Sequence, residues 1–127
     1  MVTKAFLRMR LPKEKKEKRK RVGLDVVYHI PDRLTEGYGV NCDSIRALAK
    51  DGVSLIVTVD TGITAIDEVT LANELGVDVI ITDHHECRPE LPDAVAAVDP
   101  KRPDCKYPFK DLAGVGVAFK LICAYNC

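Results

Sequence analysis

Metal-competent side chains follow two apolar runs in this sequence. The stretch VIITDHHECRPELP, residues 79–92, places Asp83, His84 and His85 directly after unbroken apolar residues. The run VSLIVTVD, residues 53–60, ends in Asp60 in the same way. Carboxylate oxygens and imidazole nitrogens both bind divalent ions. A mixed set of this kind suits Mn²⁺, Fe²⁺ or Zn²⁺ better than Ca²⁺.

Both apolar runs are typical of strands that are buried on two faces of a parallel sheet. We expect them to be neighbours because a single helix joins them, and adjacent strands lie about 4.8 Å apart. Ligands collect at the carboxyl ends of the strands in such sheets. The sequence therefore predicts that Asp60 and Asp83 approach one divalent cation or bridge two, with His84 and His85 beside them.

Two other interpretations of these residues stay open. Asp60 and Asp83 can instead cap the helices that follow them, with the histidines exposed in a loop. His84, His85 and Cys87 can hold a structural zinc ion, although adjacent ligands rarely complete a closed tetrahedron. None of the five cysteines forms a C-x-x-C pair, so neither a zinc ribbon nor a disulfide framework is indicated.

Two further segments carry weaker signals for binding a nucleic acid. PDRLTEGYG, residues 31–39, combines Arg33 with Tyr38, and an arginine near an aromatic residue suits phosphate pairing and base stacking. LAGVGVAFK, residues 112–120, can place the backbone amides of Gly114 and Gly116 near an anion at a helix start. Each segment also has a plainer interpretation: an ordinary loop for the first and close helix packing for the second.

The elements that would position these residues predict an α/β protein with a mostly parallel sheet flanked by helices. After a short helix over residues 2–9, strands are expected near 23–31, 53–60, 77–83 and 94–100. Further helices are expected over 44–51, between Thr64 and Gly76, and as a buried helix over 112–125. Asn41 or Asp43 can cap the first of these, and Thr64 with Asp67 forms a capping-box-like pair for the second.

Composition is typical of one soluble globular domain, with 46% hydrophobic and 30% charged residues among 127. No apolar run approaches the roughly 18 residues of a membrane span and no signal peptide opens the chain, so a cytoplasmic location without a membrane partner is expected. Residues 1–21 hold ten Lys or Arg and two Glu. We interpret residues 1–21 as a basic helix with a charged linker or insertion, either a solvated arm or a nucleic-acid footprint.

Four segments together resemble a known family in their order and spacing. IPDRLTEGYG, VTVDTGI, TDHH and DLAGVGVAFKL are similar to the RecJ single-strand-specific exonucleases of the DHH phosphoesterase superfamily. The likeness covers about residues 22–125, so residues 22–127 are interpreted as a partial DHH domain of Rossmann-like architecture. It implies a Mn²⁺- or Mg²⁺-dependent phosphodiesterase, with two metal ions, that degrades single-stranded DNA from its 5′ end in repair and recombination. A single-stranded-DNA-binding protein is a further partner that it implies.

The resemblance also implies a role for each candidate residue. Asp60 would be the carboxylate shared between the metals, and His84 a direct metal ligand. His85 would contact the scissile phosphate or the attacking water, and Asp83 would orient the site. Arg33 and Tyr38 would help to hold the nucleic acid.

The sequence also departs from the RecJ pattern. It lacks the Asp-x-Asp-x-Asp-Gly type motif that ends the first strand of such domains, and a further metal-binding Asp expected after DLAGVGVAFKL. We therefore expect a chain truncated at both ends, with Asp60 and His84 as direct ligands and water completing the coordination. Little or no nuclease activity is expected from such a site. A sheet without its first strand would expose an apolar edge, so low stability or self-association is also expected.

Two alternative functions are weighed against this one. Another DHH phosphodiesterase would act on short oligonucleotides or cyclic dinucleotides, but EGYG and LAGVGVAFKL favour the RecJ type. A DHH-like scaffold would bind DNA or proteins without catalysis, but Asp60 and the intact DHH triplet argue against that for the parent enzyme.

Overall fold

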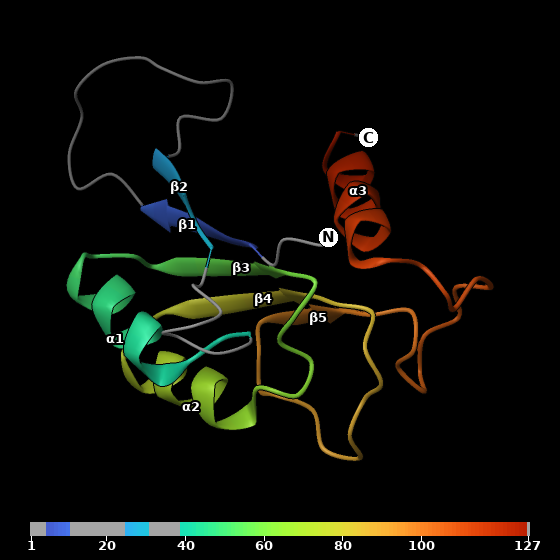
Figure 1. Ribbon diagram of the computed structural model, residues 1–127, viewed down its shortest axis with the longest axis horizontal. Helices are drawn as coiled ribbons and strands as arrows, with labels where there is room; N and C mark the ends of the chain where they lie inside the picture. The colour runs from blue at the N-terminus through green and yellow to red at the C-terminus, as the bar shows by residue number, and fades with distance from the viewer. Residues whose placement is uncertain (1–4, 11–24, 31–38, 127) are drawn as a thin grey trace.

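The protein has an α/β fold built on one five-stranded sheet (Figure 1). The structure is a computed structural model that describes residues 5–10, 25–30 and 39–126. The strand order is β2-β1-β3-β4-β5. The elements in chain order are β1 (Ala5–Arg10), β2 (Asp25–His29), α1 (Cys42–Lys50), β3 (Leu55–Val59), α2 (Ile66–Glu74), β4 (Asp78–Thr82), β5 (Ala96–Val98) and α3 (Gly114–Tyr125).

The half of the sheet that carries the candidate site is parallel, as the sequence predicts. Val57 of β3 pairs with Ile80 of β4, and Thr82 of β4 pairs with Val98 of β5. Helix α2 connects β3 to β4, which makes a β-α-β unit and brings the carboxyl ends of the strands to one edge. The predicted α/β class and the flanking helices are confirmed.

The helix predicted over residues 2–9 is wrong, because residues 5–10 form strand β1. β1 is antiparallel to both neighbours: Leu7 pairs with Tyr28 of β2 and with Val57 of β3. The sequence LRMR alternates apolar and charged residues with the period of a strand, and pairing on both sides satisfies the backbone groups of the segment. β1 also occupies the place beside β3, so β3 does not form the exposed edge that we expected.

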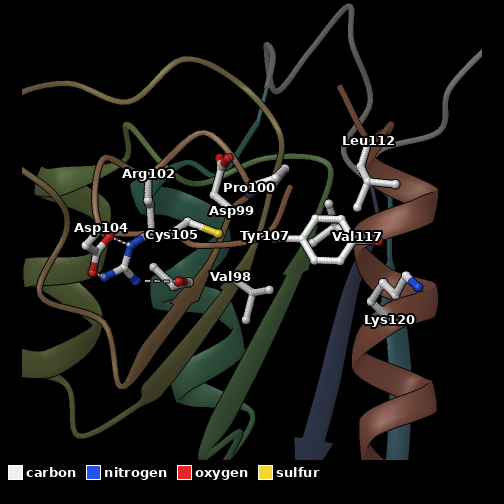
Figure 2. Close-up of a pocket in the computed structure, with 11 residues that line it drawn as sticks. Val98, Asp99, Pro100, Arg102, Asp104, Cys105, Tyr107, Leu112, Val117 and Lys120 are labelled. Carbon is white, nitrogen blue, oxygen red and sulfur yellow. Dashed lines mark hydrogen bonds and ion pairs between the residues drawn. The ribbon is translucent and has the colours of Figure 1, made fainter. Parts of the chain in front are cut away.

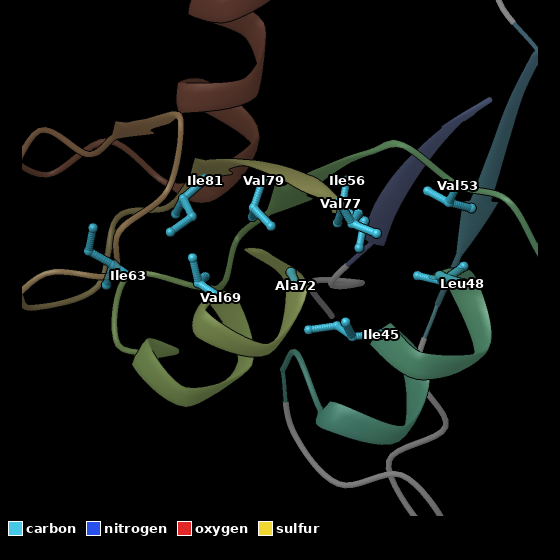
Figure 3. Close-up of a cluster of buried hydrophobic side chains, with 10 residues drawn as sticks. All are labelled: Ile45, Leu48, Val53, Ile56, Ile63, Val69, Ala72, Val77, Val79 and Ile81. Atoms are coloured by element: carbon cyan, nitrogen blue, oxygen red, sulfur yellow. The ribbon is translucent and has the colours of Figure 1, made fainter. Parts of the chain in front are cut away.

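One face of the sheet is covered by α1 and α2, and the hydrophobic core lies between them and the strands (Figures 1 and 3). Inward residues recur at helical spacing on the helices and at every second position on β4. The core consists of Ile45, Leu48, Val53, Ile56, Ile63, Val69, Ala72, Val77, Val79 and Ile81.

The predicted helix caps have opposite outcomes. Asn41 caps α1 as predicted, because its side-chain oxygen accepts a hydrogen bond from the Ser44 amide at 2.8 Å. Thr64 does not cap α2, which begins after Ala65 without a side-chain cap. The amide of Ile63 is bound to Asp83 instead, which fixes the backbone just before Thr64, and the helix begins at Ile66.

Helix α3 is not the buried helix that its apolar sequence predicts. Only Gly114 and Val117 are buried, and α3 lies beside the carboxyl ends of β3 and β4, on the side away from α1 and α2 (Figure 1). Helix α3 is rich in apolar residues, as predicted, but few of the other described residues pack against it. None of the three described helices is long and apolar enough to cross a membrane. The basic linker, most of residues 1–21, lies outside the described residues.

Candidate metal centre

Three neighbouring parallel strands each end in a buried aspartate. Asp60 follows β3, Asp83 follows β4 and Asp99 follows β5, and they are 4%, 1% and 3% exposed. The pairing of Thr82 with Val98, and a 3.0 Å hydrogen bond from the Asp83 amide to the Val98 carbonyl, put Asp83 and Asp99 at equivalent positions. Asp99 was not among the predicted site residues, although AVAAVDP repeats the pattern of an apolar strand followed by Asp.

Asp60 has the backbone conformation of a sharp turn. Its φ is +63°, in the left-handed region that Asp tolerates better than most residues. Its amide donates to the Thr82 carbonyl at 2.9 Å, which anchors the turn to β4. Its Oδ1 atom is buried and accepts no hydrogen bond of good geometry from the part of the chain that the structure describes, yet it lies 2.8 Å from Nε2 of His84. Two electron-pair donors that converge in this way are typical of ligands for one cation.

Asp83 fixes the backbone around the site through hydrogen bonds to its side chain. Its Oδ2 accepts the Ile63 amide at 3.0 Å, and its Oδ1 accepts the His84 amide at 2.8 Å. The same Oδ1 lies 3.4 Å from the His85 amide and 2.5 Å from Nδ1 of His85. Both oxygens are therefore used to fix the loop after β4, which agrees with the orienting role expected for Asp83.

The contact with Asp83 determines which ring nitrogen of His85 carries the hydrogen. A carboxylate only accepts hydrogen bonds, so Nδ1 of His85 carries the hydrogen and Nε2 keeps its lone pair. The His84 and His85 rings lie with their centroids 4.5 Å apart. One ligand atom from each of Asp60, His84 and His85 can be chosen so that all lie within 4.8 Å of one another. One oxygen and two nitrogens fit Mn²⁺ better than Mg²⁺, which prefers oxygen.

The structure does not support helix capping by the aspartates or a zinc site with Cys87, although the histidines do lie in a loop and His85 is exposed, as the first of these alternatives expected. Neither Asp60 nor Asp83 caps a helix, because α2 begins after Ala65 and the Asp83 oxygens bind loop amides. Cys87 is not part of the ligand cluster found in the described chain. Burial, and next the nearby Asp99 carboxylate, raise the pKa of the Cys87 thiol.

Gly114, at the start of α3, packs directly against the site. A Cβ atom at Gly114 would lie 2.4 Å from Oδ1 of Asp60 and 2.6 Å from its Cβ. A Cβ at Gly116 would lie 3.2 Å from Cδ2 of Leu112, the flexible end of a side chain in the same segment. The packing interpretation therefore holds for Gly114, and the predicted contact of both glycines with nucleic acid stays a prediction. Arg33 and Tyr38 lie outside the described residues.

Comparison with known proteins defines the class to which this fold and site belong. The model of the DHH family, N-terminal domain, matches residues 1–127, and the chain therefore belongs to the DHH family.

Several of the relatives are RecJ exonucleases, as the sequence motifs predict. The chain is 60% identical over 101 residues to the single-stranded-DNA-specific exonuclease RecJ of Bacillus subtilis, and 44% identical over 100 residues to that of Escherichia coli. These matches cover 80% and 79% of this chain, but only 13% and 17% of the relatives. The chain thus spans less than a fifth of their length.

Two solved structures share the fold. A crystal structure of exonuclease RecJ bound to manganese matches with a TM-score of 0.61 at 40% identity, covering 72% of this chain and 23% of that one. RecJ from Thermus thermophilus in complex with Mn²⁺ matches with a TM-score of 0.53 at 35% identity, covering 65% and 12%.

Proposed function

We propose that this chain carries the central part of the metal centre of an exonuclease that degrades single-stranded DNA from its 5′ end. The observation that carries the proposal is the convergence of Asp60, His84 and His85 at the carboxyl ends of adjacent strands. The names of the RecJ relatives support single-stranded DNA as the substrate, and the Mn²⁺ in the two RecJ structures supports the metal. A role in DNA repair and recombination, in the cytoplasm and beside a single-stranded-DNA-binding protein, belongs to the same proposal.

Each residue has a defined part in this proposal. Asp60 and His84 hold a divalent cation, which when bound supplies charge stabilisation to a phosphoryl oxygen and acidifies water. His85 contacts the scissile phosphate or the attacking water. With the hydrogen on Nδ1 facing Asp83, the Nε2 lone pair of the neutral ring can accept a hydrogen from that water, whereas a hydrogen bond to a phosphate oxygen requires the protonated ring. Asp83 itself touches no reactant and positions both histidines.

The activity of the isolated chain should be low. Of the three candidate ligand atoms in the described residues, this proposal places those of Asp60 and His84 on the cation, whereas hard divalent cations take about six ligands. Water completes the coordination and leaves the cation free to shift, and a misplacement of about 1 Å can reduce a rate by roughly 100-fold. We propose Mn²⁺ binding, with weak hydrolysis at most, as the behaviour of these 127 residues.

Electron paramagnetic resonance of free Mn²⁺ tests the metal centre directly. Asp60→Asn and His84→Ala should each raise the dissociation constant for Mn²⁺ by at least about tenfold, within the range for loss of a group that supports a metal. Asp78→Asn is a matched control, because Asp78 is an exposed carboxylate at the opposite end of β4. Equal Mn²⁺ affinity in all four proteins would refute the proposed centre.

Substrate and direction require labelled DNA. With Mn²⁺ present, a single strand labelled at its 5′ end should release labelled mononucleotide before a strand labelled at its 3′ end does, and a duplex should resist. His85→Ala should abolish release without removing Mn²⁺ binding. Faster hydrolysis of a cyclic dinucleotide than of the single strand would favour the alternative DHH phosphodiesterase.

A further inference from the structure

A pocket of about 520 Å³ opens between the loop after β5 and helix α3 (Figure 2). Its volume lies in the range of sites for small molecules. We call it the β5–α3 pocket. Its walls are Ala97, Val98, Asp99, Pro100, Arg102, Asp104, Cys105, Tyr107, Leu112, Val117 and Lys120.

The β5–α3 pocket adjoins the metal centre through two shared elements. Asp99 ends β5 at the position equivalent to Asp83 on β4, one residue after the Thr82–Val98 pair. Helix α3 supplies Val117 and Lys120 to the pocket, and its first residue packs on Asp60. A molecule whose one end lies at the metal centre can therefore extend into the pocket.

The Asp99 carboxylate is a polar group built into an apolar wall. Its Oδ1 accepts the Lys101 amide at 2.8 Å, whereas its Oδ2 is buried and has no hydrogen-bond partner among the described residues. Leaving a buried acceptor unpaired destabilises the folded protein. Burial is also the main reason that the pKa of Asp99 is raised above its ordinary value. Oδ2 becomes accessible to a ligand in the pocket when the Asp99 side chain turns toward it, and a ligand that then donates a hydrogen to Oδ2 would remove this penalty.

The opposite wall of the pocket offers an aromatic ring and a cation. The Lys120 ammonium lies 5.7 Å from the centroid of the Tyr107 ring, a cation–π arrangement. Within the part of the chain that the structure describes, Lys120 forms no ion pair with a carboxylate. Tyr107 and Lys120 therefore provide a surface for a flat ring and a positive charge for a phosphate.

The loop that forms the wall is held in place without a ligand. The Arg102 guanidinium binds both Asp104 carboxylate oxygens, at 2.9 and 2.6 Å, and donates to the Ala97 carbonyl at 2.5 Å. Lys110 donates to the Cys105 carbonyl at 2.6 Å. A pocket that is already formed loses less conformational entropy when a ligand binds.

We propose that the β5–α3 pocket binds a nucleobase of the strand whose phosphate lies at the metal centre, which makes this inference depend on the proposed function. The base lies between the Tyr107 ring and the apolar wall. An exocyclic amine or a ring N–H of the base donates to Oδ2 of Asp99, and the Lys120 ammonium faces a phosphate of the same strand. Stacking on an aromatic residue accepts any base, and the Asp99 contact requires only that the base carries a donor.

Nuclear magnetic resonance titration in EDTA tests the pocket without metal. The probes are dCMP, its N4,N4-dimethyl analogue, which cannot donate to Asp99, and deoxyribose 5-phosphate, which has no base. We expect dCMP to shift the amide signals of residues 97–120 and to bind at least about tenfold tighter than either other probe, the ratio for one hydrogen bond to a charged group. Equal binding of all three, or no binding of dCMP, would overturn the proposal.

Variants separate the pocket from a non-specific anion site. Tyr107→Ala should weaken dCMP binding about 5- to 100-fold, the loss that follows removal of a base-stacking ring. Asp99→Asn should weaken dCMP but leave the dimethyl analogue unchanged. Tyr125→Ala is the matched control, because Tyr125 is an exposed tyrosine of α3 that does not line the pocket. Circular dichroism melts of each variant verify that it folds.

The two proposals can fail separately. If dCMP does not bind but Mn²⁺ binding still depends on Asp60, the pocket is refuted and the metal centre stands. If dCMP binds through Tyr107 and Asp99 but no Mn²⁺ binds, the metal centre is refuted and the nucleotide pocket stands.

Discussion

The two sides of the sheet differ sharply in how they are covered. On one side, α1 and α2 pack on the strands and enclose ten buried apolar residues (Figure 3). On the other side, α3 buries only Gly114 and Val117, while four of its apolar side chains are 58–71% exposed. These four are Val115, Phe119, Ile122 and Tyr125.

The difference indicates a division within this small domain: one side of the sheet stabilises the fold, and the other carries the candidate site. The α1–α2 side contributes most of the buried apolar area and hence most of the stability. The buried aspartates lie at the strand ends beside α3, where polar groups cost stability but provide chemistry. The following changes test this division, from the largest expected effect to the smallest.

The largest effect is expected in the core. Ile81 is fully buried in β4, so Ile81→Ala should lower the free energy of unfolding by about 2–5 kcal/mol, the cost of truncating a buried Ile and leaving a cavity. Phe119→Ala on α3 should change it by less than about 0.5 kcal/mol, as for other surface substitutions. Urea denaturation measures both, and similar losses for the two would remove the distinction between the sides.

The second-largest effect is expected on Mn²⁺ affinity, at Gly114, where α3 contacts the metal centre. Gly114→Ala places a methyl group 2.4 Å from Oδ1 of Asp60, so either the helix or the carboxylate must move. We expect the dissociation constant for Mn²⁺ to rise about 10- to 100-fold, as when a residue that supports a ligand is lost. Gly116→Ala is the control and should leave Mn²⁺ affinity unchanged. Unchanged affinity in Gly114→Ala would mean that α3 does not constrain Asp60.

A smaller effect on stability is expected at the N-terminus of α1. Asn41→Ala removes the hydrogen bond to the Ser44 amide and should lower the free energy of unfolding by about 1 kcal/mol. Mn²⁺ affinity should not change, because α1 lies on the other side of the sheet. Arg46→Ala, at an exposed position of the same helix, serves as the control, and an equal loss there would mean that the effect is not specific to the capping hydrogen bond.

The smallest effect is expected from Asp99→Asn, which should stabilise the folded protein at neutral pH. Burial raises the pKa of Asp99 in the folded protein, so folding favours its protonated form. The wild type should therefore lose stability as the pH rises through this raised pKa, and Asp99→Asn should not. The variant should melt at a higher temperature at neutral pH, by a gain that shrinks in acid. The gain stays modest because the Lys101 amide partly stabilises the carboxylate. A variant that is less stable at neutral pH would contradict this.

Local patterns in the sequence were sufficient to predict the centre of the fold and most of the site. The apolar runs before Asp60 and Asp83 indicate buried parallel strands, and the topology then requires that their polar ends meet. Asp99 shows the same pattern and was missed because β5 is only three residues long and mostly exposed.

The wrong predictions concern segments whose structure depends on contacts with residues far away in the sequence. Residues 5–10 have apolar residues compatible with either periodicity, and pairing with β2 and β3 decides for a strand. Thr64 has the chemistry of a cap, but the bond from Ile63 to Asp83 places the helix start elsewhere. The sequence of α3 indicates an apolar helix but carries no information on how much of the described chain packs on it.

The contact between Asp60 and Gly114 also sets an order of events during folding. The core joins segments that are close in the sequence, from α1 to β4, and such contacts form early. The Asp60–Gly114 contact closes a much longer stretch of chain, so its entropic cost is met only after the core has formed. During synthesis from the N-terminus, the core can assemble while α3 is still inside the ribosome. A nascent chain that has not yet exposed Gly114 would therefore hold a folded sheet with an unfinished metal centre.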